Sequence, residues 1–302
     1  MRDPALPGLA SDFRSQLIID RYSSVLSRLP LRRQAAMAGA GSRSAEIWNV
    51  FRTLAQLDPS LWLPRLLAVG RLRLPFAASD LEAGVGLTLW KRIKPPPERL
   101  AWLQKRALSG QARPPVGRRQ KGRVIPLSAL RDNLRERARR KVPLEDPLEV
   151  DVIVKTRDWI VLVEIPGPEE APDEPTASDR DRTRILRLID AGLSYAEGRS
   201  RALRQPIRFA LLVLPMGELA GEAWTSALRR FTASPLRLRR ALPHRAGGFD
   251  PRRTLGNVGS GSWSAVDQLL HSLRRDASDD FEAVLLDRLL RYRESAGSPA
   301  AS

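Results

Sequence analysis

Three carboxylates lie inside a stretch that otherwise has the pattern of two apolar strands. The segment LEVDVIVKTRDWIVLVEIPG, residues 148–167, carries Glu149, Asp151 and Glu164 among valine, leucine and isoleucine. Closely spaced carboxylates can share a proton, or they can hold a divalent cation that activates water for phosphoryl transfer. The alternative without chemistry is a solvated strand face whose acids pair with nearby arginine or lysine.

The alternation of side chains predicts that two of these acids meet. Glu149 and Asp151 share one face of the first strand with Ile153 and Lys155, and its even-numbered apolar residues form the other face, which we expect to be core. A tight reversal between the strands gives antiparallel pairing with Asp151 opposite Glu164. Like charges at Cβ distances of roughly 4.5–5.5 Å repel. Either a raised pKa keeps one acid neutral, or a cation lies between the two.

The composition excludes several other kinds of site. The chain has no cysteine, so disulfides, thiol nucleophiles and cysteine-bound metals are absent. With only His244 and His271, histidine-rich metal sites and Ser/His/Asp triads are disfavoured. A metal in this chain would therefore have oxygen ligands, which favours magnesium, manganese or calcium.

The charge of the chain indicates an anionic partner. Its 51 basic and 34 acidic residues give +17, which would attract nucleic acid through its phosphates. Five cations between Arg113 and Arg123 lie in a Gly- and Pro-rich segment that we expect to be an exposed loop, able to touch phosphates or simply solvated. However, 45 of the basic residues are arginine, a bias that a GC-rich genome would produce without any nucleic-acid surface.

The sequence indicates a cytoplasmic protein without a membrane partner. No stretch approaches the roughly 18 consecutive apolar residues that a membrane span needs. The first residues, MRDPALPGLASDFRS, lack the apolar run of a signal peptide.

Hydrophobic periodicity then predicts the elements that would position the acids. Helices are expected over 11–29, 42–57, 61–69, 95–108, 127–140, 264–275 and 279–293, and strands over 84–93, 148–155, 159–165 and 207–215. A capping box at Ser178–Asp181 would open a further helix, so that 207–215 lies parallel to 159–165 after a crossover. The loop GNVGSGSW lacks the spacing of known phosphate-binding loops and predicts a plain N-cap turn.

We therefore expect an α/β fold with a central mixed sheet of four or five strands, flanked by helices and extended by helices at both ends. The expected division is a helical segment at 1–72 that contributes Glu46, an α/β core at 73–216 and a mainly helical extension at 217–302. All three would form one compact unit.

The order of motifs resembles the PD-(D/E)XK nuclease superfamily, which has a restriction-endonuclease-like core. The resemblance rests on AEIWNVF with Glu46 and Asn49, on EVDVIV, and on IVLVEIP after the turn. It covers Glu46 to about Pro215, and the tail around Trp263 also resembles bacterial members of that superfamily. The resemblance implies a DNA endonuclease that uses Mg²⁺ or Mn²⁺.

The resemblance also implies a role for each matching position. Glu46 would be the helix acid, Asp151 the principal metal ligand, Glu164 the second ligand, and Ile165 the donor of a backbone carbonyl. The motif lysine, which would position water and offset charge in the transition state, falls at Pro166.

Three other cations could replace this lysine. Lys155 lies four residues along the strand from Asp151, about 13 Å at the usual rise. Arg182 and Arg184 lie at the start of the crossover helix and could stabilise charge without acting as a base.

Three functions stay open at this point. The first is a magnesium-dependent nuclease that hydrolyses DNA through water held by Asp151 and Glu164, with Glu46 assisting. The second is a catalytically degenerate nuclease-like protein that binds nucleic acid or a protein partner, which Pro166 favours. The third is a scaffold whose charge reflects genome bias alone.

Overall fold

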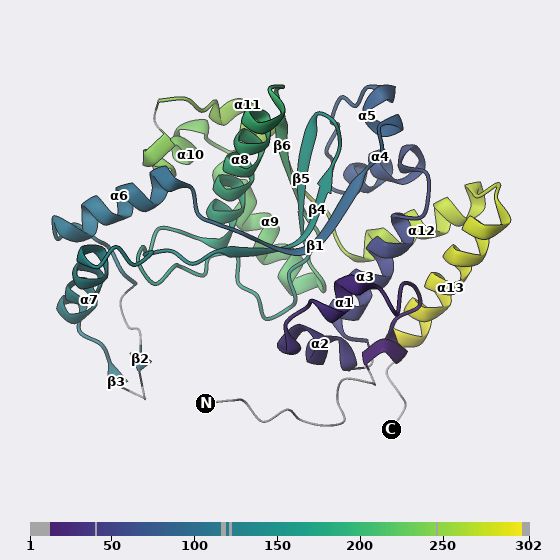
Figure 1. The fold of residues 1–302 in the computed structure, drawn as a ribbon, viewed down its shortest axis with the longest axis horizontal. Coiled ribbons are helices and arrows are strands. Elements are labelled where there is room, and N and C mark those ends of the chain that lie inside the picture. The colour runs from purple at the N-terminus through teal and green to yellow at the C-terminus, as the bar shows by residue number, and fades with distance from the viewer. Residues whose placement is uncertain (1–12, 40, 116–118, 121–122, 246, 298–302) are drawn as a thin grey trace.

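A five-stranded mixed sheet forms the centre of the chain (Figure 1). The computed structural model describes residues 13–39, 41–115, 119–120, 123–245 and 247–297. The strand order is β1-β4-β5-β6-β7, where β1, β4 and β5 are successively antiparallel and β5, β6 and β7 are parallel. The strands are β1 (Gly86–Ile93), β4 (Leu148–Lys155), β5 (Trp159–Glu164), β6 (Arg208–Val213) and β7 (Val258–Ser260). The predicted α/β class and mixed sheet are confirmed.

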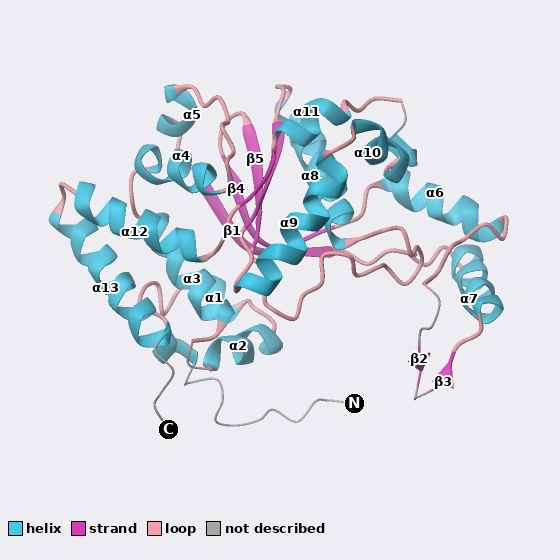
Figure 2. Cartoon of the chain, turned by 180° about the vertical axis from the view of Figure 1, so that it is seen from behind, coloured by secondary structure: helices cyan, strands magenta, loops and turns pink. Residues whose placement is uncertain are grey.

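Helices from both ends of the chain cover one face of the sheet (Figures 1 and 2). Val152, Val154 and Val161 pack there against Phe51 and, from the C-terminal end, Leu289. The two ends of the chain therefore share one core. The elements of this layer are η1 (Phe13–Gln16), α1 (Ser24–Ser27), α2 (Leu31–Ala38), α3 (Arg43–Leu54), α4 (Pro59–Val69), α5 (Ala78–Glu82), α12 (Ser264–Asp276) and α13 (Asp280–Gly297).

A second group of helices covers the other face. Ile153, Ile160 and Leu162 pack there against Leu188 and Trp224. The elements are α8 (Arg184–Leu203), α9 (Glu218–Thr232), α10 (Pro235–Ala241), η2 (Pro243–Arg245) and α11 (Pro251–Gly256). The crossover through α8 joins the parallel strands β5 and β6, as predicted. None of the helices that the structure describes is both long and apolar enough to cross a membrane.

A separate pair of helices, α6 (Pro97–Leu108) and α7 (Leu127–Arg139), projects from one end of the sheet, opposite α13 (Figure 1). They have a small core of their own, formed by Leu103, Ala107, Ala112, Leu134, Ala138 and Leu144. Between them lies the short hairpin β2 (Arg119–Gln120) and β3 (Arg123–Val124), so the segment predicted as a loop is partly paired. Two of its five cations, Arg118 and Lys121, lie outside the described residues. We call residues 94–141 the α6–α7 module.

The continuous helix predicted over 11–29 is wrong. Only η1 and α1 form there, and Asp20 between them has a left-handed backbone with φ of 53°. Side chains of α3 bond to the backbone that such a helix would need for itself. Asn49 accepts from the Ile18 N–H, and Trp48 Nε1 donates to the Ile19 carbonyl. Tertiary contacts therefore override the helical periodicity of this segment.

The predicted capping box is also wrong, because α8 begins later. Thr183 is its N-cap, and its hydroxyl accepts from the Leu186 N–H at 3.4 Å. Ser178 and Asp179 are instead buried in the preceding loop. The loop therefore uses these polar residues for tertiary contacts and leaves the cap to a threonine.

The Gly-rich loop contains a strand that sequence periodicity did not indicate. Residues 258–260 form β7 at the edge of the sheet, parallel to β6. A Cβ atom on Gly259 would lie 2.2 Å from the Gly70 carbonyl oxygen, and one on Gly261 would lie 2.5 Å from that of Val69. The glycines are therefore required because the backbone after α4 touches the backbone of β7.

We expect Gly259→Ala to lower the free energy of unfolding by roughly 1–3 kcal/mol or more, because its Cβ would meet backbone that cannot move aside cheaply. Gly198→Ala within α8 is the matched control, since nothing lies within 4 Å of its Cβ position. That control should be neutral or stabilising by up to about 1 kcal/mol. Urea denaturation of both variants checks this, and equal stability of the two would contradict the close approach.

Candidate functional site

The candidate site lies where β4 and β5 stop pairing. The register runs from Lys155–Ile160 to Val152–Val163, which confirms the predicted hairpin. The paired register ends there, so the direct pair of Asp151 with Glu164 is not formed in the described ladder. Asp151 Oδ2 instead accepts the Ile165 N–H at 2.9 Å. A carboxylate thus takes the place of a strand partner at the end of the hairpin.

A distortion of β1 opposite Asp151 accompanies a change in the face toward which the side chains of β4 point. Trp90 has a left-handed backbone with φ of 51°, and the ladder between β1 and β4 omits Trp90 and Asp151. Val152 packs in the core on the α3 side, whereas Val150 packs in the core on the α8 side. The prediction that Leu148, Val150, Val152 and Val154 share one face is therefore wrong. Both faces of β4 are core, and the alternation shifts at Asp151.

Arg43, the first residue of α3, binds the turned carboxylate. Its Nη2 lies 2.7 Å from Asp151 Oδ2, and its Nε donates to the Ile165 carbonyl at 2.6 Å. Its Nη1 lies 2.7 Å from Glu170 Oε1, in the acidic loop that follows β5. One guanidinium therefore bridges two carboxylates and a backbone carbonyl, and it fixes the start of α3 to the end of the hairpin.

Arg184 makes the corresponding contact from the opposite layer. It is the first residue of α8, and its Nε donates to Glu164 Oε1 at 2.6 Å. Glu164 is fully buried, and its Oε2 has no hydrogen-bond partner among the described residues. Asp151 and Glu164 therefore each have an arginine partner, and the two arginines come from opposite faces of the sheet.

Burial dominates the electrostatics of the two acids. Burial and then the charge of Asp151 raise the pKa of Glu164 to about 8, although Arg184 opposes this shift. Burial also raises the pKa of Asp151, against the lowering effect of Arg43. A proton on Glu164 would occupy the unpartnered Oε2 while Oε1 accepts from Arg184. Of the two alternatives expected from the sequence, the raised pKa applies to both acids. The positive charge comes from arginines on either side of the pair and not from a cation between the acids.

The donor set does not fit a divalent cation. Magnesium and manganese need oxygen ligands that are free to coordinate. Here Arg43 engages Asp151 Oδ2 and the Ile165 carbonyl, and Arg184 engages Glu164 Oε1. No group of three histidine, aspartate or glutamate side chains that could hold a metal occurs within the described residues. In this arrangement guanidinium groups supply the positive charge.

Glu46 contacts neither Asp151 nor Glu164 but residues of the C-terminal helices. Trp263 Nε1 donates to Glu46 Oε1 at 2.6 Å, and Arg293 Nη1 lies 2.6 Å from the same oxygen. These contacts join α3 to α12 and α13. Glu46 thus ties the C-terminal helices to the core, and Arg43, one turn earlier on the same helix, is the residue that reaches Asp151.

Of the three cations proposed to replace the lysine, only Arg184 contacts the carboxylate pair. Arg184 reaches Glu164, whereas Arg182 lies 2.6 Å from Asp190 and 3.2 Å from Glu145 in another buried network. Lys155 lies at the far end of β4, with its Nζ 5.9 Å from the Tyr195 ring centre. The buried Pro166 continues the backbone, and its carbonyl accepts from the Met216 N–H at 2.9 Å.

Sequence reasoning missed Arg43 and the partner of Glu149. Glu149 bonds to Arg33 of α2, which also lies over the Trp90 ring at 5.0 Å. A signal for Arg43 exists in the sequence, because a cation in the first turn of a helix opposes the helix dipole. Both Arg43 and Arg184 occupy that position. Such a cation requires a specific anion nearby, here Asp151 and Glu164.

We expect Arg43→Ala to lower the free energy of unfolding by about 3–5 kcal/mol, because it leaves Asp151 buried without its cation. Adding Asp151→Asn should recover part of this loss, since asparagine can still accept from Ile165. The matched control is Arg65→Ala, which removes an exposed pair with Asp276 and should cost less than about 1 kcal/mol. Urea denaturation measures all three, and an Arg43→Ala cost no larger than that of Arg65→Ala would contradict the pairing.

The raised pKa of Glu164 predicts a pH dependence of stability. The folded protein keeps this proton up to about pH 8, whereas the unfolded chain releases it near 4.5. The unfolded state therefore binds fewer protons in this window, and the free energy of unfolding falls as pH rises, by at most about 1.4 kcal/mol per unit for one proton. Glu164→Gln should flatten the slope measured by urea denaturation between pH 5 and 8. An unchanged slope would assign it to other groups.

Comparisons with known proteins identify no relative. No family model matches the sequence, no curated protein matches it, and no solved structure matches it.

Proposed function

We propose that this chain binds nucleic acid through the α6–α7 module and that its carboxylate pair is structural. The observation that carries the proposal is the concentration of charge. Residues 94–141 contain fifteen lysines and arginines against three acidic residues, so this module supplies +12 of the net +17. A genome-wide arginine bias would spread its cations along the whole chain.

The cations of α7 and of the two residues that follow it are available to a ligand. Arg131, Arg139, Arg140 and Lys141 are exposed, and α7 buries Leu134 and Ala138 against α6. A helix of 13 residues is about 20 Å long, which corresponds to roughly six nucleotides at 3.4 Å each. The ion pairs of Glu136 with Arg139 and Arg140 are solvent-exposed and therefore weak. Phosphates can replace them at little cost.

The arrangement at Asp151 supports binding over hydrolysis. The resemblance to nucleases implies a metal between Asp151, Glu164 and the Ile165 carbonyl, but Arg43 and Arg184 engage these groups. Pro166 also removes the motif lysine. Metal-dependent hydrolysis of DNA is the second candidate. The nearness of Asp151 and Glu164 favours it, but it requires Arg43 and Arg184 to release the oxygens that they engage.

We expect a labelled DNA duplex to bind with an affinity that falls steeply with salt, because phosphate contacts release counterions. The double variant Arg139→Glu/Arg140→Glu should weaken binding and reduce the salt slope by about 2. The matched control is Arg288→Glu/Arg291→Glu, which makes the same charge change at exposed positions of α13. Fluorescence anisotropy across a salt series measures both.

Two results would contradict the proposal. If both double variants lose the same affinity for DNA, net charge alone accounts for the binding and the module has no specific role. Nicking of supercoiled plasmid by the wild type with Mg²⁺ or Mn²⁺, abolished by Asp151→Asn, would establish the nuclease and reject a purely structural role for the carboxylates.

A further inference from the structure

A cavity of about 270 Å³ lies where α6 meets α10, next to the α6–α7 module. Arginines from both helices line it together with an indole ring and two small apolar residues. The cavity thus joins the basic module to the body of the molecule. Its lining includes Trp102, Arg106, Ala112, Arg113, Arg240 and Pro243.

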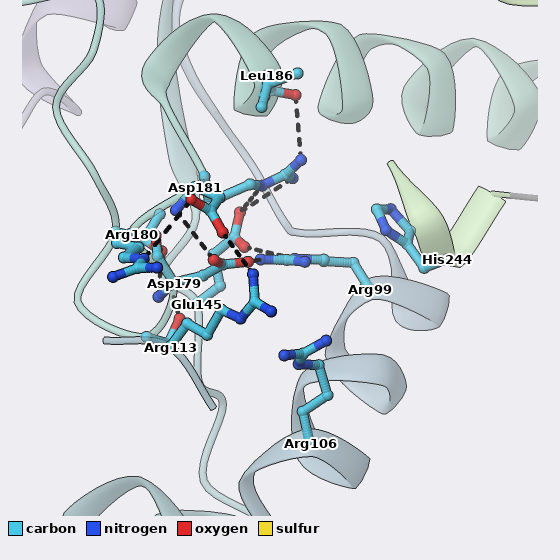
Figure 3. A network of polar contacts seen from close by, with 12 residues as sticks. Arg99, Arg106, Arg113, Glu145, Asp179, Arg180, Asp181, Leu186 and His244 are labelled. Carbon is cyan, nitrogen blue, oxygen red and sulfur yellow. Dashed lines mark hydrogen bonds and ion pairs between the residues drawn. The ribbon is translucent and has the colours of Figure 1, made fainter. Parts of the chain in front are cut away.

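A paired network of buried charges reaches the cavity through two of its lining residues, Arg99 and Asp179, and we call it the floor (Figure 3). Arg99 is 1% exposed, with its Nη2 2.7 Å from Asp179 and its Nε 3.2 Å from Glu145. Glu145 also binds Arg182, which in turn binds Asp190 of α8. Because each of these charges has a partner, the floor fixes α6 relative to α8.

The cavity lining holds four arginines and two aspartates, Asp179 and Asp181, so two of the arginines have no carboxylate partner among the described residues. Arg113 lies 3.5 Å from Asp181, so its charge is offset. Arg106 donates to the Gln111 carbonyl, a neutral acceptor, and its guanidinium lies 4.7 Å from the Trp102 ring centre. Arg240 is exposed and forms no ion pair with any described residue. Two uncompensated cations from distant parts of the chain therefore converge on one cavity.

We infer that this cavity binds one nucleotide of a single-stranded nucleic acid, with its phosphate held by Arg106 and Arg240. The sugar and base are assigned to Trp102, Ala112 and Pro243, which are uncharged lining residues; Arg99 and Arg106 each lie 4.7 Å from the Trp102 ring centre. A cavity of about 270 Å³ is slightly smaller than the roughly 300–1,000 Å³ of small-ligand sites and is too small for a duplex. The inference rests on the proposed function and adds to it that this cavity binds single-stranded and not duplex nucleic acid.

Arg240→Glu tests the inference, with Arg239→Glu as the matched control. Arg239 is exposed on the same helix but does not line the cavity, and the charge change is identical. We expect Arg240→Glu to weaken binding of a labelled single strand about tenfold or more relative to Arg239→Glu, because a charge-assisted phosphate contact is lost. Duplex binding should change equally in the two variants. Thermal melting of both confirms that they fold.

Oligonucleotides with different 5′ ends distinguish whether the cavity binds the terminal nucleotide or an internal one. A 5′-phosphorylated oligonucleotide that binds better than its hydroxyl-ended form, with inorganic phosphate as competitor, indicates capture of a strand end. Equal binding of the two, with the Arg240→Glu effect retained, indicates an internal nucleotide. Either result supports the inference. Equal effects of Arg240→Glu and Arg239→Glu on the single strand overturn it. If the wild type shows no salt-dependent binding to any nucleic acid, the proposed function itself is overturned.

Discussion

The structure depends on two arginines that neutralise two buried carboxylates from opposite sides of one sheet. Asp151 and Glu164 lie at the same end of the β4–β5 hairpin, and Arg43 and Arg184 begin the helices that cover its two faces. Each arginine occupies a helix position where a cation is unfavourable unless an anion is near. The ion pairs therefore fix where α3 and α8 start, and with them the layers that enclose the core. A buried pair of this kind positions elements more than it adds net stability.

Much of the fold could be predicted from the sequence because local patterns determine it. The hairpin follows from alternating apolar residues around a tight turn, and α3 and α8 follow from helical periodicity. Residues 11–29 also have helical periodicity, yet Trp48 and Asn49 take their backbone groups. The strand β7 has only three residues, one of them Gly259, and Gly261 follows it, so hydrophobic periodicity could not indicate a strand there. Its existence depends on contact with residues 69 and 70, far away in the sequence.

The candidate site could be predicted only in part, for the same reason. The three carboxylates are visible as polar residues in apolar strands, and Arg184 is close in sequence to its partner. Arg43 is 108 residues away from Asp151, so its position in the first turn of a helix indicates that an anion lies nearby but not which one. The shift of side-chain alternation at Asp151 depends on the backbone of Trp90 in a neighbouring strand. Neither contact has a local sequence pattern.

The paired network beneath α6 also affects the kinetics of association. Arg99, Glu145 and Arg182 are almost fully buried and paired, so α6, against which the basic helix α7 packs, is already fixed before a partner arrives. Little conformational entropy is then lost on encounter, and no slow rearrangement precedes contact. The rate of association would be limited by diffusion in the field of the module, and the dissociation rate would distinguish one nucleic acid from another.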